Sequence, residues 1–310
     1  MSFFLWLWFE EIAVCTVALV ALGILLHAAR VSTVTVRGES FIGRVSALLA
    51  LAGIVLLWWS RWWATPDENV WRYALPILAA VFAIAIHATF SARATGERQF
   101  DAVDLALRSI WSYGSRWWFV GWWTLAALIT ATVVLAGLAS STDERGRYTM
   151  MVIQLGTSRA GTTFFGWSFG LPVLVALAVL VAVVLMALRR VSIPAVPADP
   201  IHRERDRAHR RGRTRTILSI ACGAVSFTLG ASWLFIGQSS RLAASMSTPE
   251  GMRVDVGTSF AALAMPLAVG GILLEGLGLA LIAFALFQPR ARAADRSRVP
   301  SAARAESVAN

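Results

Sequence analysis

The sequence predicts an all-α integral membrane protein, a bundle of seven transmembrane helices. Of its 310 residues, 57% are hydrophobic and 15% are charged, and the mean hydropathy is +0.64. A soluble domain cannot bury that much apolar surface, whereas a bilayer can. The apolar runs are unbroken and about 20 residues long, enough to cross roughly 30 Å of hydrocarbon as helices, and they lack the alternation of barrel strands. They lie at about residues 12–29, 45–63, 72–90, 117–139, 169–188, 216–237 and 260–287.

The N-terminal segment predicts a first helix that is retained. It begins MSFFLWLWFEE, has no arginine before Arg30 and shows no convincing small-residue cleavage site. We expect residues 3–9 to lie in the outer headgroup region ahead of the first span. Residues 1–287 are then one transmembrane domain.

The arginines predict how the bundle is oriented. The chain contains no lysine, and 21 of its 28 arginines lie in residues 30–44, 91–116, 189–215 and 288–310. The loops on the other side hold the remaining seven. Basic residues are enriched in cytoplasmic loops. We therefore expect a bacterial plasma-membrane protein with its N-terminus outside and its C-terminus inside.

The spans after the first one form three helical hairpins that point outward. Each returning helix carries an early proline, at Pro76, Pro172 and Pro266. A proline is tolerated in the first turn of a helix because its missing N–H would have no partner there.

The last two hairpins share a short motif, GTTF at residues 161–164 and GTSF at residues 257–260. The motif favours either a repeated hairpin or common helix-entry chemistry. Thr163 or Ser259 is expected to cap the returning helix. YTMMVIQL at 148–155 and MRVDV at 252–256 are strand-like, which predicts a small outer β-ribbon.

Tryptophans crowd one outer turn, in the sequence WWSRWW around Arg61. An aromatic belt at the headgroups is the usual role of such residues. The alternative is a cation–π box for a quaternary ammonium ligand.

The inner loop, residues 189–215, predicts contact with acidic lipid headgroups. It is interrupted by prolines and then reads as a short basic helix. Docking of a membrane or cytoplasmic protein is the alternative, and one such loop does not indicate nucleic-acid binding. The tail from residue 288 is polar and expected to be disordered. The arginines expected to make these contacts are Arg203, Arg205, Arg207, Arg210, Arg211, Arg213 and Arg215.

Known catalytic motifs are missing from the sequence. It contains no GxSxG, GxGD or HExxH, no phosphate-binding glycine loop and no evident pair of carboxylates within the spans. The sequence therefore does not predict an enzyme. His27 and His87 lie at similar depth near the inner ends of their spans, which is compatible with a haem or metal site or with chance. No other cofactor is indicated.

Glu275 is the one carboxylate clearly inside a predicted span. A charge at the bilayer centre is unfavourable by about 3 kcal/mol, so Glu275 should face other helices. Small residues share its helical stripe, which indicates close approach by a neighbouring helix. The sixth span carries a matching stripe with Cys222, Ser226 and Gly230, and Ser226 or Thr228 is the expected hydrogen-bond partner.

Two roles for Glu275 remain open at this stage. It is either a protonated residue that holds helices together or a proton- or cation-binding carboxylate. Thr130 and Thr132 of the fourth span are further candidate neighbours. The sequence shows no charged partner for it.

Three motifs carry a resemblance to other proteins. GTTFFGWSFGLP, RTRT at the start of the sixth span and GTSFAAL make residues 140–287 similar to uncharacterised multi-pass membrane proteins of high-GC Gram-positive bacteria. That resemblance implies class and compartment only.

The sequence thus supports two functional hypotheses. The first is small-molecule or ion transport, or ligand binding, at a site between spans six and seven around Glu275. The second is a non-catalytic accessory or sensor subunit that holds partners through its tryptophan-rich outer face and its arginine-rich inner loop.

Overall fold

Long helices dominate the fold. The computed structural model describes residues 3–30, 39–63, 69–93, 113–155, 158–193, 200–247 and 253–287. Over these residues, seven helices are long and apolar enough to cross a membrane. They are α1 (Phe3–Arg30), α2 (Glu39–Trp63), α3 (Leu75–Arg93), α4 (Arg116–Ala139), α5 (Trp167–Ser192), α6 (Pro200–Ser239) and α7 (Ala264–Leu286).

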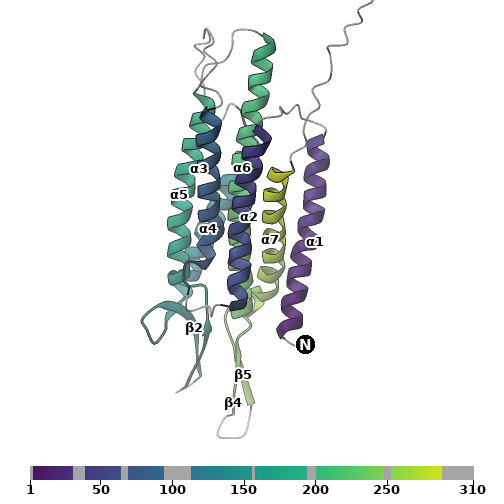
Figure 1. The fold of residues 1–310 in the computed structure, drawn as a ribbon. Coiled ribbons are helices and arrows are strands. Elements are labelled where there is room, and N and C mark those ends of the chain that lie inside the picture. Colours follow the sequence, from purple (N-terminus) through teal and green to yellow (C-terminus); the bar gives the residue numbers. More distant parts are fainter. Residues whose placement is uncertain are drawn as a thin grey trace, which may run out of the picture.

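Short elements connect the helices at one end of the bundle, which we call the strand end (Figure 1). Among the described residues these are two 3-10 helices and five strands. They are η1 (Arg72–Ala74), β1 (Ser141–Thr142), β2 (Tyr148–Leu155), β3 (Ser158–Thr163), β4 (Ala243–Ser247), β5 (Arg253–Gly257) and η2 (Ala261–Leu263).

The strands form two antiparallel ribbons that project from the bundle (Figure 1). One ribbon has the strand order β1-β2-β3, and the other pairs β4 with β5 from Ala243 opposite Gly257 to Ser247 opposite Arg253. The strand predicted at 148–155 is confirmed as β2, and the one predicted at 252–256 corresponds to β5.

The expected side-chain caps of the returning helices are wrong. Gly166 precedes α5 and Leu263 precedes α7, and neither helix has a side-chain cap. Thr163 instead ends β3, where its backbone oxygen accepts a hydrogen bond from the Ser239 hydroxyl at 2.7 Å. Ser259 lies in the turn between β5 and η2, and η2 separates it from the start of α7.

Helix α6 is the central helix of the bundle. In the apolar spanning segment of α6, 94% of the residues are buried, whereas only 11% are buried in the spanning segment of α1. It packs against α2, α3, α4, α5 and α7, while α1 packs mainly on α7. The sequence predicted a linker and a separate basic helix before the sixth span. The structure has one unbroken helix of 40 residues there, because no proline follows Pro200 within it.

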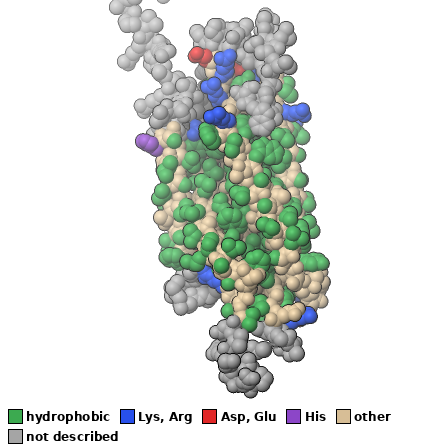
Figure 2. All heavy atoms as spheres, turned by 180° about the vertical axis from the view of Figure 1, so that it is seen from behind, with side chains coloured by type: hydrophobic (Ala, Val, Ile, Leu, Met, Phe, Trp, Pro, Cys, Tyr) green, Lys and Arg blue, Asp and Glu red, His purple; other side chains and the backbone are tan. Residues whose placement is uncertain are grey.

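The flank of the bundle is apolar. Figure 2 shows hydrophobic side chains covering the long sides, with arginines gathered mostly toward the end opposite the strands. Side chains such as Leu19, Phe82 and Leu135 are exposed on these sides. Exposed apolar residues over the length of seven helices are what a surface in contact with lipid requires.

Candidate functional site

A close contact between α6 and α7 positions Glu275. Glycines remove the side chains that would separate the two helices, and they recur every seven residues on α6 at Gly223, Gly230 and Gly237. A Cβ atom on Gly230 would lie 2.6 Å from the backbone oxygen of Gly271 and 2.7 Å from the backbone nitrogen of Glu275. The acid is therefore fixed where the two backbones approach most closely.

Arg61 of α2 is the charged partner of Glu275. Its Nη2 donates a hydrogen bond to Oε1 of Glu275, and its Nη1 lies 3.7 Å from Oε1 of Glu10 on α1. The expectation that Glu275 has no charged partner is therefore wrong. So is the expectation that no carboxylates pair inside the spans, because α1 extends the first span back to include Glu10. We call Glu10, Arg61 and Glu275 the acid–arginine cluster.

The cluster is shielded from its surroundings. Glu275 is 0% exposed and is the middle residue of the 23-residue helix α7, Glu10 is 4% exposed, and the Arg61 side chain is 19% exposed. Gln238 at the end of α6 adds a hydrogen bond from Nε2 to Oε2 of Glu10 at 3.4 Å. Three helices, α1, α2 and α7, thus contribute the charged side chains of the cluster, and α6 adds the exposed Gln238 at its edge.

Two polar atoms beside the cluster are left without hydrogen bonds. Within the described part of the chain, Oε2 of Glu275 has no donor and Nε1 of Trp58 has no acceptor. The indole N–H of Trp58 lies within interacting range of the Glu275 carboxylate, so these two groups are also candidate partners of each other. A buried oxygen with an unused acceptor position is costly unless something else occupies it.

The charges of the cluster do not balance. Two carboxylates share one guanidinium, which leaves one excess negative charge when both acids are ionised. Charges interact strongly where water is excluded, so the excess favours a proton or a small cation. The arrangement can therefore hold such an ion, or the positively charged part of a ligand.

The predicted partners of Glu275 on α6 are buried but do not bind it. Cys222 is 3% exposed, and Ser226 and Thr228 are 0% exposed. The hydroxyls of Ser226 and Thr228 make no hydrogen bond to any described residue. Gly230, one turn further along, occupies the position next to the acid.

The two threonines expected on the other side are engaged elsewhere. The Thr130 hydroxyl donates to the backbone oxygen of Ala126 at 2.8 Å, and the Thr132 hydroxyl accepts from Nε1 of Trp233 at 3.0 Å. Both contacts belong to the packing of α4, so neither residue contributes to the acid–arginine cluster.

The structure does not bring the two histidines together. His27 is exposed on α1, and His87 is buried on α3 with Gly43 of α2 close to its ring. Helices α1 and α3 lie on opposite sides of α2 (Figure 1). Among the described residues, no group of three or more His, Cys, Asp or Glu side chains is arranged to hold a metal ion.

The basic segment of α6 divides into exposed and packed arginines. Arg207 and Arg211 are exposed, as contact with lipid or a partner requires. Arg210 departs from that expectation, because it is 4% exposed and donates to the backbone oxygen of Val191 at 3.1 Å. Arg215 also turns inward, with its guanidinium 4.4 Å from the ring centre of Phe284.

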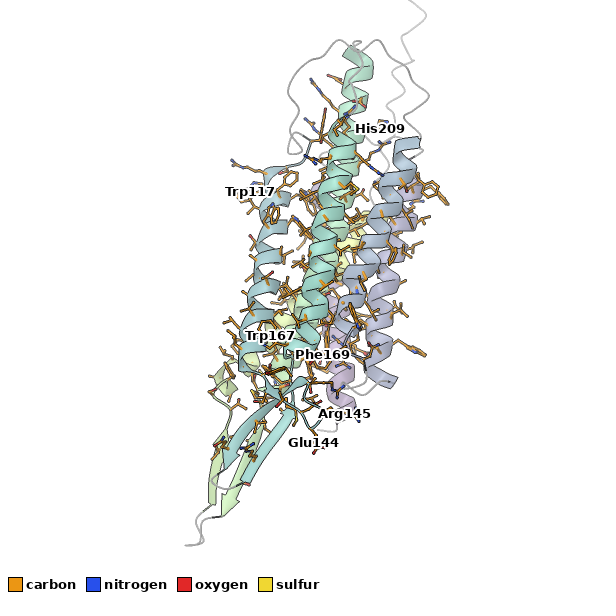
Figure 3. All side chains as sticks on the ribbon, turned by 90° about the vertical axis from the view of Figure 1, so that its left-hand side faces the viewer. Trp117, Glu144, Arg145, Trp167, Phe169 and His209 are labelled. Atoms are coloured by element: carbon orange, nitrogen blue, oxygen red, sulfur yellow. The ribbon has the colours of Figure 1, made fainter. Side chains whose placement is uncertain are left out.

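The remaining three arginines of the predicted set differ in how far the structure describes them. Arg213 is half-buried, whereas the side chains of Arg203 and Arg205 lie outside the described residues. Figure 3 shows the neighbouring His209 and, on α4, Trp117 at this end of the bundle, far from Trp167 and Phe169.

Arg61 and Glu10 are the site residues that sequence reasoning missed. The sequence places Arg61 in a tryptophan-rich outer turn, and Glu10 lies just before the first predicted span. The usable signal is that an arginine and acids of opposite charge lie at the outer ends of neighbouring spans, while Glu275 lies within another span. Pairing isolated charges of opposite sign would have suggested the contact.

Comparison with known proteins finds no family model, no curated protein and no solved structure that matches this chain. The described helices alone define its class. It is a mostly helical protein with seven helices long and apolar enough to cross a membrane in the described residues, and with an acid–arginine cluster among three of them.

Proposed function

We propose that this protein is a small-molecule or ion transport or ligand-binding protein of the bacterial plasma membrane, and that the acid–arginine cluster is its binding site. One observation supports this most directly. Glu275 is fully buried at the middle of α7, where its carboxylate is bound by Arg61 and interacts with the indole of Trp58. Buried intramembrane acids mark ion or substrate sites more often than they serve packing alone.

The charge balance of the cluster indicates what it binds. Arg61 contacts both acids, and one negative charge remains when both are ionised. A proton on either carboxyl, or a monovalent cation beside Oε2 of Glu275, brings the site to neutrality. In a transport protein, such a site couples the movement of a substrate to that of an ion.

The proposal includes an orientation. Most of the arginines in the described residues lie at the end opposite the strands (Figure 2), and basic residues favour the cytoplasmic side. In this orientation the N-terminus and both ribbons lie outside, and the C-terminus lies inside. Attachment of a cysteine-reactive label to single-cysteine variants in intact cells tests it: a cysteine at Glu144 should react and one at Arg211 should not.

The experiment that tests the binding site is thermal unfolding of the purified full-length protein at different pH values. The 14 tryptophans supply the fluorescence signal. Between pH 5 and pH 8 the wild type should become less stable, because loss of the shared proton leaves an unbalanced buried charge. Glu275→Gln should remove most of that dependence. Glu144→Gln, an exposed acid labelled in Figure 3, is the matched control and should retain it.

A second measurement on the same samples tests ligand binding. Monovalent cations and a panel of small organic cations should raise the unfolding temperature of the wild type, but not that of Glu275→Gln. If the two proteins share one pH dependence and no cation stabilises either, the cluster is a structural contact and the proposal fails.

A role as an accessory or sensor subunit is the second candidate. It is favoured by the two ribbons, which project past the bundle at the strand end, and by Trp59 and Trp71, which are 63% and 49% exposed there. Cross-linking in native membranes separates the candidates. A stable partner linked through β2 or β5 favours the accessory role, and a protein that responds to cations without one favours transport or ligand binding.

A further inference from the structure

A second buried arginine lies at the strand end. Arg72 is the first residue of η1, the short helix that leads into α3, and it is 4% exposed. Trp71, directly before it, is 49% exposed. Exposed tryptophans at the end of a membrane helix lie at the level of the lipid headgroups. Arg72 is therefore buried in protein, but close to the boundary between lipid and water.

Aromatic rings from three helices surround the Arg72 guanidinium. Its Cζ lies 4.8 Å from the ring centre of Tyr73, 5.9 Å from that of Phe169 on α5 and 5.7 Å from that of Phe235 on α6. The rings also pack on one another, with Tyr73 stacked on Phe235 at 5.8 Å. Such contacts stabilise a desolvated cation by about 2 kcal/mol or more, but they leave its charge in place.

The hydrogen-bond donors of this group exceed the available acceptors. Nη2 of Arg72 donates to the Tyr73 hydroxyl at 2.9 Å. Nε of Arg72 has no acceptor, and no described carboxylate forms an ion pair with this guanidinium. No described residue accepts the hydrogen of the Tyr73 hydroxyl either. A buried cation and two unused donors thus lie together, and Glu275, the acid that interacts electrostatically with Tyr73, is hydrogen-bonded to Arg61 and not to this group.

We propose that Arg72 and Tyr73 form a binding site for an oxyanion, a carboxylate or phosphate group. The guanidinium presents a planar fork that matches two oxygens of such a group, and the Tyr73 hydroxyl supplies one further donor. The anion also neutralises the charge that the aromatic rings leave uncompensated. This site shares no hydrogen-bonding residue with the acid–arginine cluster and does not depend on the role proposed for it, although the Tyr73 hydroxyl lies within electrostatic reach of Arg61 and Glu275.

The oxyanion has two plausible sources, a lipid headgroup and a soluble anion, since Trp71 places the site near the headgroups. Both sources use the same donors. They are distinguished by supplying the group either in the bilayer or in the buffer.

The test measures the unfolding temperature of the purified full-length protein. In an uncharged detergent, sodium phosphate and sodium benzoate are compared with sodium chloride at equal ionic strength. In nanodiscs, phosphatidylglycerol is compared with phosphatidylcholine. The wild type should show a saturable rise with at least one oxyanion. Tyr73→Phe keeps the ring and its packing and should lose most of the rise, as should Arg72→Gln.

Two controls isolate the effect. Arg116→Gln removes an arginine that lies 5.4 Å from a tryptophan ring at the opposite end of the bundle, and it should keep the full rise. Glu275→Gln should keep it as well, so failure of one site is visible while the other persists. A rise confined to phosphatidylglycerol identifies a lipid headgroup, and a rise confined to the buffer arms identifies a soluble anion.

The proposal is overturned in two ways. Either no oxyanion in either arm stabilises the wild type beyond sodium chloride, or Tyr73→Phe responds as strongly as the wild type does. If Arg72→Gln does not fold, the response of Tyr73→Phe to the oxyanion is sufficient to decide whether these donors bind it.

Discussion

The two buried arginines at the strand end are held in opposite ways. Arg61 is bound by two carboxylates from α1 and α7, whereas Arg72 is bound by one hydroxyl and the faces of three aromatic rings. Counted by contacts alone, the first site has one more negative than positive charge, and the second has a guanidinium that no described carboxylate contacts. The Tyr73 hydroxyl lies within electrostatic reach of both sites. A buried arginine can thus mark a site for a cation or for an anion, and its neighbours decide which.

Removing Arg61 should have the largest effect on stability. Arg61→Gln leaves Glu10 and Glu275 buried without a cation, which costs about 3–5 kcal/mol for a broken buried pair. Thermal unfolding of the purified protein measures the loss, and Arg145→Gln in the exposed turn is the control (Figure 3). If Arg61→Gln is no less stable than Arg145→Gln, Arg61 does not stabilise the two buried carboxylates.

A change at Gly230 should disturb the acid–arginine cluster without touching a charge. In Gly230→Ala the new methyl group meets the backbone of α7, and overpacking of this kind costs about 1–3 kcal/mol. Gly212→Ala on the same helix has open space around it and should be neutral or stabilising. Gly230→Ala should also reduce the pH dependence of unfolding while leaving the oxyanion response at Arg72 unchanged. Equal stability of the two variants would show that α7 can move away freely.

The two acids of the cluster should differ in how much they stabilise the folded protein. Glu10 lies 3.7 Å from Arg61 and also accepts a hydrogen bond from Gln238, so Glu10→Gln keeps part of its contacts. We expect a change of about 1 kcal/mol, smaller than that for Glu275→Gln. Unfolding temperatures of both variants at pH 8 measure the order. If Glu10→Gln lowers the unfolding temperature more than Glu275→Gln does, Glu10 and not Glu275 is the main partner of Arg61.

An acid in the turn before β2, outside the spanning helices, supplies the smallest effect and the baseline. The backbone N–H and the guanidinium of Arg147 hold the pKa of Asp143 below its ordinary value. Its stabilising contribution is therefore present above the unfolded-state pKa and is lost as the pH falls through the folded-state pKa. Asp143→Asn should change the unfolding temperature slightly at pH 7 and not at all near pH 2. A large effect at pH 7 would mean that the turn supports the bundle.

The sequence predicts the elements of this fold better than their contacts. Long apolar runs locate the seven helices of spanning length, and the strand-like residues 148–155 locate β2, because both signals are local. Partners of Glu275 depend on the depth and tilt of α2, which no local pattern records. The stripe predicted on α6 shows the same limit: spacing by four favoured Ser226, whereas packing follows glycines spaced by seven. A spacing of seven stays nearly aligned along a helix, while a spacing of four drifts around it.

Helix α6 links the two ends of the molecule in a way that its neighbours do not. At 1.5 Å per residue its 40 residues measure about 60 Å, roughly twice the hydrocarbon thickness. One half carries the basic segment, with Arg210 anchored to the end of α5, and the other half presents Gly230 to Glu275. The helix has no internal proline at which to bend. A tilt imposed on its basic segment would therefore be transmitted along the rigid helix to Gly230. From there it would shift the backbone of α7 at Glu275, which is fully buried.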